Sequence, residues 1–429
     1  MSETETTSLL DELTWRGMLV QTTEGLAEAL AAGSVRAYCG FDPTASSLHV
    51  GSLVPIMGLV HLQRAGHRPV ALVGGGTGMI GDPSGRTAER QLNGREIVEE
   101  HTRAIRGQLE HFLDFDGPNA AMMADNADWL GPLNLIEFLR DVGKHFSVNV
   151  MLAKESVRAR METGISYTEF SYMLLQAYDF AELRRRHGVT VQLGGSDQWG
   201  NMTAGADLIR RMDGASAHAF TLPLLTTAAG TKFGKTAEGA VWLDPARTSP
   251  YAFYQFWINT DDRDVGRLLR FFTLLSREEI EALDAETAAH PERRAAQQAL
   301  AVDVTTRVHG AEATRAAQEV SALLFAKGDP RQLSPAALDA LAKEVPFVQL
   351  PAPADGAALD AIDAFVAAGL VPSKGAARRL LEQGGLTISG RRLAAGDREV
   401  QPGDFLGGPD LLLRKGARDY ALVRVTRSS

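Results

Sequence analysis

The segment Ala37–Leu53 reads AYCGFDPTASSLHVGSL and passes from a short apolar run into the start of a helical pattern. The run Arg36–Phe41 predicts a buried strand, and VGSLVPIMGLVHLQRAG, from Val50 onward, predicts the helix that follows. His49 and Gly51 at the helix start are poorly placed for core packing. A helix N-terminus has unpaired N–H groups and a positive dipole end, so the segment suits a bound phosphate. An Asp-Pro-Thr turn with a capping histidine is the alternative, which the segment alone leaves open.

Strand and helix patterns continue to alternate along the first half of the chain. The runs Pro69–Gly75 and Val189–Gly195 predict two more strands. Helical patterns follow from Gly94, with Asn93 as the expected N-cap, and from Ser196. Strands that alternate with helices indicate a parallel sheet covered by helices, so we expect an α/β fold.

Composition shifts divide the chain into regions. We expect a strand-containing domain at 1–248 with a mostly helical insertion at about 112–179, an all-helical domain at 249–327, a linker at 328–355, and a small α+β domain at 356–429.

Composition narrows the class of protein. The 429 residues are 45% hydrophobic and 23% charged, which is ordinary for a globular protein with a sizeable core. Cys39 is the only cysteine, so a disulfide framework is excluded and a reducing compartment fits. The N-terminus is acidic and polar without a signal-peptide pattern, and no apolar run approaches the ~20 residues of a membrane span. We therefore expect a cytoplasmic protein with no membrane partner.

Charge is distributed unevenly. The chain has a net charge of −9, which argues against a general nucleic-acid binder. Residues 372–429 contain eleven Lys or Arg and six Asp or Glu, a net of +5, so the remainder carries −14. A basic tail on an acidic body suggests a local site for a polyanion, and chance asymmetry of a soluble surface is the alternative.

A second phosphate-related element is KFGKT at Lys232–Thr236, in the loop TTAAGTKFGKTAEG. Two lysines three residues apart in a Gly-rich loop can act as a mobile cationic clamp. Such a clamp suits a leaving pyrophosphate, whose charge it meets in the transition state. A solvated basic loop is the alternative.

Together the two elements resemble class I aminoacyl-tRNA synthetases. The further motifs ALVGGGTGMIGDPSGR, DVGKHFSVN, TEFSYMLLQAYDF and LGGSDQWGN narrow the resemblance to tyrosyl-tRNA synthetases of the bacterial or organellar type. The resemblance covers nearly the whole chain. It implies a Rossmann-like, parallel-sheet, nucleotide-binding catalytic domain with a helical insertion. An all-α domain for the anticodon region of tRNA and a small S4-like RNA-binding domain follow it.

The resemblance also implies a tyrosine site. Tyr38 and Asp179 would hydrogen-bond the phenolic hydroxyl, which is both donor and acceptor. The remaining tyrosine-binding residues by this resemblance are Asp82, Tyr172 and Gln176 for the ammonium group and Gln198 near the reacting carboxylate. Tyr172, Gln176 and Asp179 are spaced i, i+4 and i+7, which fits one helix face and also fits an ordinary amphipathic stripe.

The implied ATP-binding residues are Cys39, Gly40, Asp42, His49, Gly51, Gly195, Asp197, Lys232, Lys235 and Thr236. The implied catalytic residues are Thr44, His49, Arg86, Lys232 and Lys235, with Arg90 assisting the lysine loop. Mg²⁺ would arrive with ATP rather than in a protein site, so no protein-bound metal is expected. Ser52 stands where this family usually has His, so we expect retained activity with weaker ATP binding.

The implied partners are L-tyrosine, ATP, tRNA(Tyr) and a second copy of the chain. The homodimer would form through the insertion, with GKHFSVN and GISYTEF at the interface. Three other functions stay open at this point. They are a tryptophan-activating relative, a structured-RNA-binding protein on the same scaffold, and another adenylyl-transferring enzyme of the same nucleotide-binding fold.

Overall fold

The computed structural model describes residues 8–84, 92–161, 164–231, 233–236, 239–326, 328–353 and 357–426. The chain divides into two compact units. The first comprises Met1–Asp244 with Thr260–Ala296, and the second comprises Pro245–Asn259 with Gln297–Ser429.

A mostly parallel sheet forms the centre of the first unit. Its strands are β1 (Gln21–Thr22), β2 (Arg36–Phe41), β3 (Arg68–Val73), β4 (Met122–Asp125), β5 (Val189–Gly195) and β6 (His218–Leu222). Their spatial order is β1-β6-β5-β2-β3-β4, and only the short β1 is antiparallel to its neighbour. The chain runs from β2 outward through β3 to β4 and then returns to β5 on the other side of β2. Such a reversal opens a crevice at the carboxyl ends of the two central strands, where α/β proteins bind ligands.

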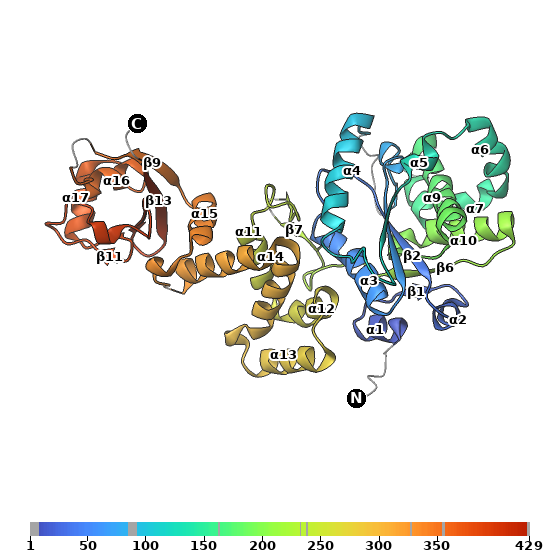
Figure 1. Ribbon diagram of the computed structural model, residues 1–429, viewed down its shortest axis with the longest axis horizontal. Coiled ribbons are helices and arrows are strands. Elements are labelled where there is room, and N and C mark those ends of the chain that lie inside the picture. The colour runs from blue at the N-terminus through green and yellow to red at the C-terminus, as the bar shows by residue number, and fades with distance from the viewer. Residues whose placement is uncertain are drawn as a thin grey trace. The chain divides into compact units, whose positions relative to one another are not determined.

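Helices cover both faces of this sheet (Figure 1). The helices of the first unit are α1 (Leu9–Trp15), α2 (Leu26–Ala31), α3 (Leu53–Arg64), α4 (Arg95–Leu109), α5 (Ala127–Leu130), α6 (Leu135–Asp141), α7 (Val148–Leu152), α8 (Glu155–Met161), α9 (Tyr167–His187), α10 (Trp199–Asp213), α12 (Asp262–Phe272) and α13 (Arg277–Ala289). On one face, α9 and α10 pack over the sheet in a core that includes Tyr38, Phe180 and Leu208. On the other face α3 packs closely, because a Cβ at Gly58 would lie within 3 Å of Leu193 and Leu222.

The predicted α/β fold with a parallel sheet is confirmed. Strands β2 and β5 have the predicted bounds, and the helix predicted from Val50 begins with the 3-10 turn η1 (Val50–Ser52) before α3. The predicted N-cap of α4 is wrong. Gly94 occupies the cap position without a side-chain hydrogen bond, because the helix begins one residue later than a cap at Asn93 requires. Strands β4 and β6 were not predicted, since each is short and has no clear flanking turn signal.

The second unit combines helices with a five-stranded sheet. Its elements are α11 (Pro250–Ile258), α14 (Ala295–Phe325, which begins in the first unit), α15 (Pro335–Glu344), β9 (Phe347–Pro351), α16 (Ala361–Ala367), α17 (Lys374–Glu382), β10 (Leu386–Ile388), β11 (Arg391–Arg392), β12 (Asp410–Lys415) and β13 (Asp419–Thr426). The sheet order is β11-β10-β12-β13-β9, with β9 parallel to β13. Gly310, at φ 86°, interrupts the helical dihedrals of α14.

The segment expected as a linker contains regular structure. Within 328–355 the structure has α15 and β9, and β9 pairs with β13 over five residues. The backbone of FVQLP is ordered by pairing with β13, a partner far along the chain that local composition could not indicate. The segment expected as a helical insertion likewise contains β4. Within the described parts of the chain, no helix combines the length and apolar character that a membrane span requires.

Candidate active site

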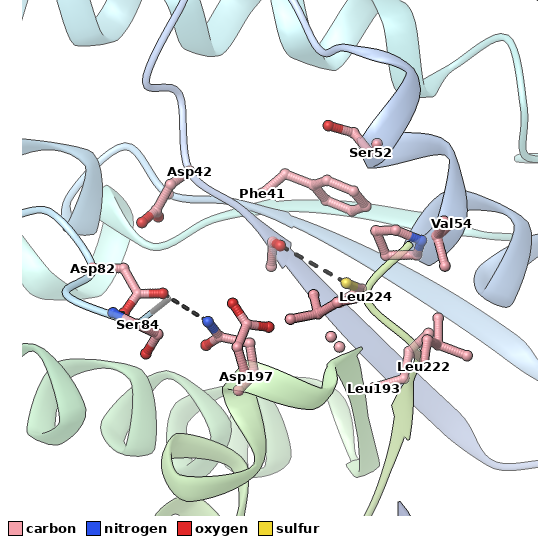
Figure 2. A pocket seen from close by; sticks show the side chains of 18 of the residues that line it. Phe41, Asp42, Ser52, Val54, Asp82, Ser84, Leu193, Asp197, Leu222 and Leu224 are labelled. Carbon is pink, nitrogen blue, oxygen red and sulfur yellow. Dashed lines mark hydrogen bonds between the residues drawn. The ribbon is translucent and has the colours of Figure 1, made fainter. Parts of the chain in front are cut away.

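A cavity of about 690 Å³ opens at the carboxyl ends of β2 and β5 (Figure 2). It lies where the strand order reverses. The sequence-predicted site residues that line it are Tyr38, Cys39, Gly40, Asp42, Thr44, His49, Gly51, Asp82, Tyr172, Gln176, Asp179, Gly195, Asp197 and Gln198. Ser52 lines it too. Arg86, Arg90 and Lys232 lie outside the described residues, and the backbone at Lys235–Thr236 forms the short strand β7.

Asp179 and Tyr38 form a buried polar end of the cavity. Asp179 is 2% exposed and accepts hydrogen bonds from Asn126 Nδ2 at 2.9 Å and Trp129 Nε1 at 2.7 Å. The Tyr38 hydroxyl is buried and has no hydrogen-bond partner among the described residues. Burial, and then the nearby Asp179, raise the pKa of Tyr38 well above its usual value. A buried hydroxyl facing a cavity without a partner is costly unless a ligand satisfies it.

Burial raises the pKa of Asp179 to about 8, although the bonds from Asn126 and Trp129 lower it. Near neutral pH the carboxyl therefore takes both forms. Its ionised form accepts a hydrogen bond and its protonated form donates one. Either form of the carboxyl can hydrogen-bond a phenolic hydroxyl, which is both donor and acceptor.

The raised pKa of Asp179 makes the stability of the ligand-free protein depend on pH. An unfolded Asp ionises near 3.9, so the buried neutral carboxyl favours the folded state below that pH, and this contribution is lost as pH rises toward 8. Asp179→Asn does not titrate. We expect the melting temperature of Asp179→Asn, relative to wild type, to rise steadily from pH 5 to pH 8. Thermal unfolding of both proteins across that range measures this, and a difference that stays constant with pH would contradict the assignment.

A second polar cluster lies around two carboxylates. Asp42 accepts from Thr77 Oγ1 and from the Tyr172 hydroxyl, both at 2.8 Å. Asp82 accepts from Gln198 Nε2 at 2.7 Å and from the backbone N–H of Ser84 at 2.9 Å. Two carboxylates and a tyrosine hydroxyl around one cavity wall can hold a cation such as an ammonium group.

The opening segment forms a capped helix start. His49 Nδ1 accepts from the Gly51 N–H at 3.0 Å, so a neutral imidazole carries its proton on Nε2. A Cβ on Gly51 would lie 2.8 Å from His49 Cε1, so glycine is required for this ring position. The structure therefore confirms that the histidine caps the turn, and phosphate binding by this segment stays a prediction.

The two phosphate-related motifs meet in space. Gly234 of KFGKT has φ 79°, and a Cβ there would lie 2.5 Å from Val50 Cγ2, next to the capped turn. The loop that leads into KFGKT is held by α12, where Asp264 accepts from the Ala228 N–H at 2.9 Å and Phe272 stacks on Phe233. A phosphate can contact both motifs only if they lie close together, and the structure brings Gly234 next to Val50.

Cys39 is not a nucleophile in this environment. Its side chain is buried and its Sγ lies 3.8 Å from the Gly40 carbonyl oxygen. Burial raises the pKa of the thiol to about 12, so it stays protonated. Among the described residues, no group of three or more His, Cys, Asp or Glu side chains is arranged to hold a metal ion.

Several residues of the site were not predicted, although one of them, Asn201, ends the motif LGGSDQWGN. Asn126 and Trp129 donate hydrogen bonds to Asp179. Gln192 lines the cavity, and its Oε1 is buried without a hydrogen-bond partner among the described residues. Asn201 lies behind the cavity wall, and Asp264 holds the loop before KFGKT. Asn126 and Trp129 are about 50 residues from Asp179, so local spacing could not connect them. Gln192 stands opposite Tyr38 in the pairing of β5 with β2, a signal that strand register supplies only after the sheet order is known.

Comparison with known proteins gives a consistent result. The family described as tRNA synthetases class I (W and Y) matches residues 30–326, and the tyrosine–tRNA ligase SYY-like C-terminal domain matches 337–423. The chain is 56% identical over 418 residues to a tyrosine–tRNA ligase of Anaeromyxobacter dehalogenans, covering 97% of this chain and 99% of that relative. It is 53% identical to the ligase of Thermobifida fusca, with the same two coverages. A C-terminally truncated mitochondrial tyrosyl-tRNA synthetase of Aspergillus nidulans aligns with a TM-score of 0.68 at 30% identity, covering 74% of this chain and 94% of that one.

Proposed function

This chain belongs to the tyrosine–tRNA ligase family of class I aminoacyl-tRNA synthetases, and on that premise we propose how its cavity performs the reaction. In the first step the tyrosine carboxylate attacks the α-phosphorus of ATP, and pyrophosphate leaves as tyrosyl-adenylate forms. In the second step the terminal ribose hydroxyl of tRNA attacks the acyl carbon, and AMP leaves. Both nucleophiles belong to substrates, so the protein contributes positioning and charge stabilisation.

The tyrosine ring enters the buried end of the cavity. The observation that supports this most strongly is the Tyr38 hydroxyl, which is buried, faces the cavity and has no partner among the described residues. With Asp179 beside it, a phenolic hydroxyl gains both a donor and an acceptor. Phenylalanine leaves the Tyr38 hydroxyl without a partner and leaves Asp179 with only its bonds from Asn126 and Trp129. Rejection of phenylalanine on this ground is already known for the family, so the proposal concerns which residues of this chain supply it.

The ammonium and carboxylate groups of tyrosine lie at the second polar cluster. Asp82, Tyr172 and Gln176 accept from the ammonium group, and Gln198 meets the carboxylate through its NH₂ group. Tyr172 already donates its proton to Asp42, which leaves its oxygen lone pairs available as acceptors.

ATP occupies the open end of the cavity. His49 donates from Nε2 to a phosphoryl oxygen as charge develops there, and Thr44, which is exposed, adds a hydroxyl. Asp197 and Gly195 lie at the end of β5, where a carboxylate can bind ribose hydroxyls. The further ATP-binding residues proposed by family resemblance are Cys39, Gly40, Asp42, Gly51, Lys232, Lys235 and Thr236. Arg86 and Arg90 complete the cationic set, and Mg²⁺ arrives with ATP as part of that substrate.

The helical domain at 249–327 and the C-terminal domain at 356–429 hold the tRNA. The net charge of +5 over residues 372–429 supports phosphate contacts by the C-terminal domain, for which we retain the S4-like assignment. A cytoplasmic location fits a chain with a single cysteine.

The enzyme works as a homodimer through the helical insertion. Exposed apolar side chains gather on α6, α7 and the start of α9, where Leu135, Ile136, Val148, Val150 and Tyr167 are between 57% and 73% exposed. Val148 lies within GKHFSVN and Tyr167 within GISYTEF. Exposed apolar clusters of this kind mark protein interfaces.

Charge placed on this apolar cluster should separate the subunits. We expect the double variant Ile136→Asp, Val148→Asp to sediment as a monomer at micromolar concentrations at which wild type is a dimer, because each carboxylate would be buried without a partner. Val20→Asp, at a 49%-exposed position outside the cluster, is the matched control and should stay dimeric. A monomeric wild type, or a dimeric double variant, would overturn the assignment.

Amino-acid-dependent ATP–pyrophosphate exchange tests the proposed function. Wild-type protein should exchange with tyrosine and show no exchange above background with phenylalanine or tryptophan. Exchange with tryptophan would instead indicate a tryptophan-activating site. Folded protein that binds ATP and exchanges with none of the three would refute the catalytic assignment.

A further inference from the structure

Asn201, in the first turn of α10, lies behind the cavity wall and is 3% exposed. Its Nδ2 atom lies 2.9 Å from Gln176 Oε1, 3.2 Å from Gln198 Oε1 and 3.5 Å from Ser84 Oγ. These three partners come from α9, from the 3-10 turn η4 (Ser196–Gln198) and from the loop after η2 (Thr77–Met79). One buried amide thus contacts three of the segments around the second polar cluster.

The bonds of Asn201 determine which way a neighbouring amide faces. Because Gln198 Oε1 is turned toward the Asn201 NH₂ group, the Gln198 NH₂ group is turned toward Asp82, to which it donates at 2.7 Å. Asp82 in turn accepts from the Ser84 N–H, and Ser84 Oγ faces Asn201 again. The contacts close into a ring, and Figure 2 shows Asp82 and Ser84 side by side within it, with the bond from Asp82 to Gln198 dashed.

An NH₂ group has two protons, so the Gln198 NH₂ group has one left after its bond to Asp82. Gln198 lines the cavity, where that second proton is available to an anionic group of the substrate. If the amide were reversed, its oxygen would face both the Asp82 carboxylate and the substrate carboxylate, which repel it. The orientation of the Gln198 amide therefore decides whether the site attracts or repels the carboxylate of the substrate.

We propose that Asn201 is a positioning residue for tyrosine activation, which orients the Gln198 amide so that its NH₂ group faces Asp82 and the substrate carboxylate. The proposal rests on the proposed function above, which assigns the carboxylate of tyrosine to Gln198. Asn201 touches no substrate atom itself. It also donates to Gln176, whose oxygen keeps a second lone pair for the substrate ammonium group.

Binding of tyrosine and of tyrosinol, which has the same phenol and ammonium groups but lacks the carboxylate, tests the proposal. In Asn201→Asp the new carboxylate repels Gln198 Oε1 and competes with Asp82 for the Gln198 NH₂ group, so this group is no longer held toward the substrate carboxylate. We expect tyrosine binding to weaken by about 10- to 100-fold and tyrosinol binding to weaken clearly less, because tyrosinol is affected only through the contact of its ammonium group with Gln176. Equilibrium dialysis with each compound, without ATP, measures both dissociation constants.

Asn201→Ala separates orientation from added charge and remains informative if Asn201→Asp does not fold. It removes the donor without adding a carboxylate that repels Gln176 and Gln198, so we expect a smaller loss of tyrosine binding and tyrosinol binding within about threefold of wild type. Equal weakening of tyrosine and tyrosinol in either folded variant would show a merely structural role and overturn the proposal, as would unchanged binding of both. Wild type that binds neither compound would instead refute the proposed function, so the two failures are distinguishable.

Discussion

Asp179→Ala is expected to lower tyrosine-dependent ATP–pyrophosphate exchange by about 100-fold in kcat/KM. In the proposed site this carboxyl, which is 2% exposed, completes the hydrogen bonding of the substrate phenol at the buried end of the cavity. Removal of the carboxyl leaves the phenolic hydroxyl without one hydrogen-bond partner, at a cost of about 1–3 kcal/mol. About 1.4 kcal/mol corresponds to a tenfold change in rate. The donors of Asn126 and Trp129 lose their acceptor as well, so the pocket shape is less well held.

The same variant should discriminate poorly against phenylalanine. Once Asp179 is absent, phenylalanine differs from tyrosine only in leaving the Tyr38 hydroxyl unpaired, as it already is without substrate. We expect the ratio of kcat/KM for tyrosine to that for phenylalanine to fall by at least tenfold. Asp207→Ala removes an exposed carboxylate of α10 and is the matched control, with no expected change. If Asp179→Ala keeps the wild-type ratio of kcat/KM for tyrosine to that for phenylalanine, Asp179 is excluded from the tyrosine site.

His49→Ala is expected to lower the maximal rate of exchange by about 100- to 1,000-fold, the usual loss when one donor to a developing charge is removed. The histidine caps η1 (Val50–Ser52) through Nδ1, which leaves the Nε2 proton as the donor in the proposed phosphate contact. In the proposed arrangement tyrosine binds at the other end of the cavity. Its dissociation constant, measured by equilibrium dialysis, should therefore stay within about twofold of wild type.

Gly51→Ala provides an independent check on the position of the imidazole. The added Cβ would lie 2.8 Å from His49 Cε1, so the ring must move while the histidine itself is retained. We expect a loss of exchange rate in the same direction as for His49→Ala, with tyrosine binding again preserved. Rates near wild type in both variants would show that this turn does not contact the reacting phosphate.

The sequence predicted the parts of the fold that have a local pattern. Strand β2 and the turn that follows it are recognisable because an apolar run meets Gly, Pro and Ser at the start of a helix. Strand β9 is not recognisable in this way. Its residues alternate in exposure and are ordered by β13, which lies more than 60 residues later in the chain.

In the candidate site, too, residues with a local sequence pattern were predicted and residues that depend on distant contacts were not. Motifs located the residues that line the cavity, but not the residues that hold them in place. The bond between Tyr172 and Asp42 spans 130 residues, and that between Gln198 and Asp82 spans 116. Asn126 carries no local signal, and the motif that ends at Asn201 does not indicate what Asn201 contacts. Both residues reach their partners because the sheet order brings α5, α9 and α10 to the same edge.

A crystal structure with a non-hydrolysable tyrosyl-adenylate analogue tests the central claim most directly. The account predicts that the phenolic oxygen lies within about 3 Å of both the Tyr38 hydroxyl and the Asp179 carboxyl, with the phosphate beside the turn of His49 and Gly51. A phenolic oxygen bound elsewhere, or a phosphate away from that turn, would contradict it.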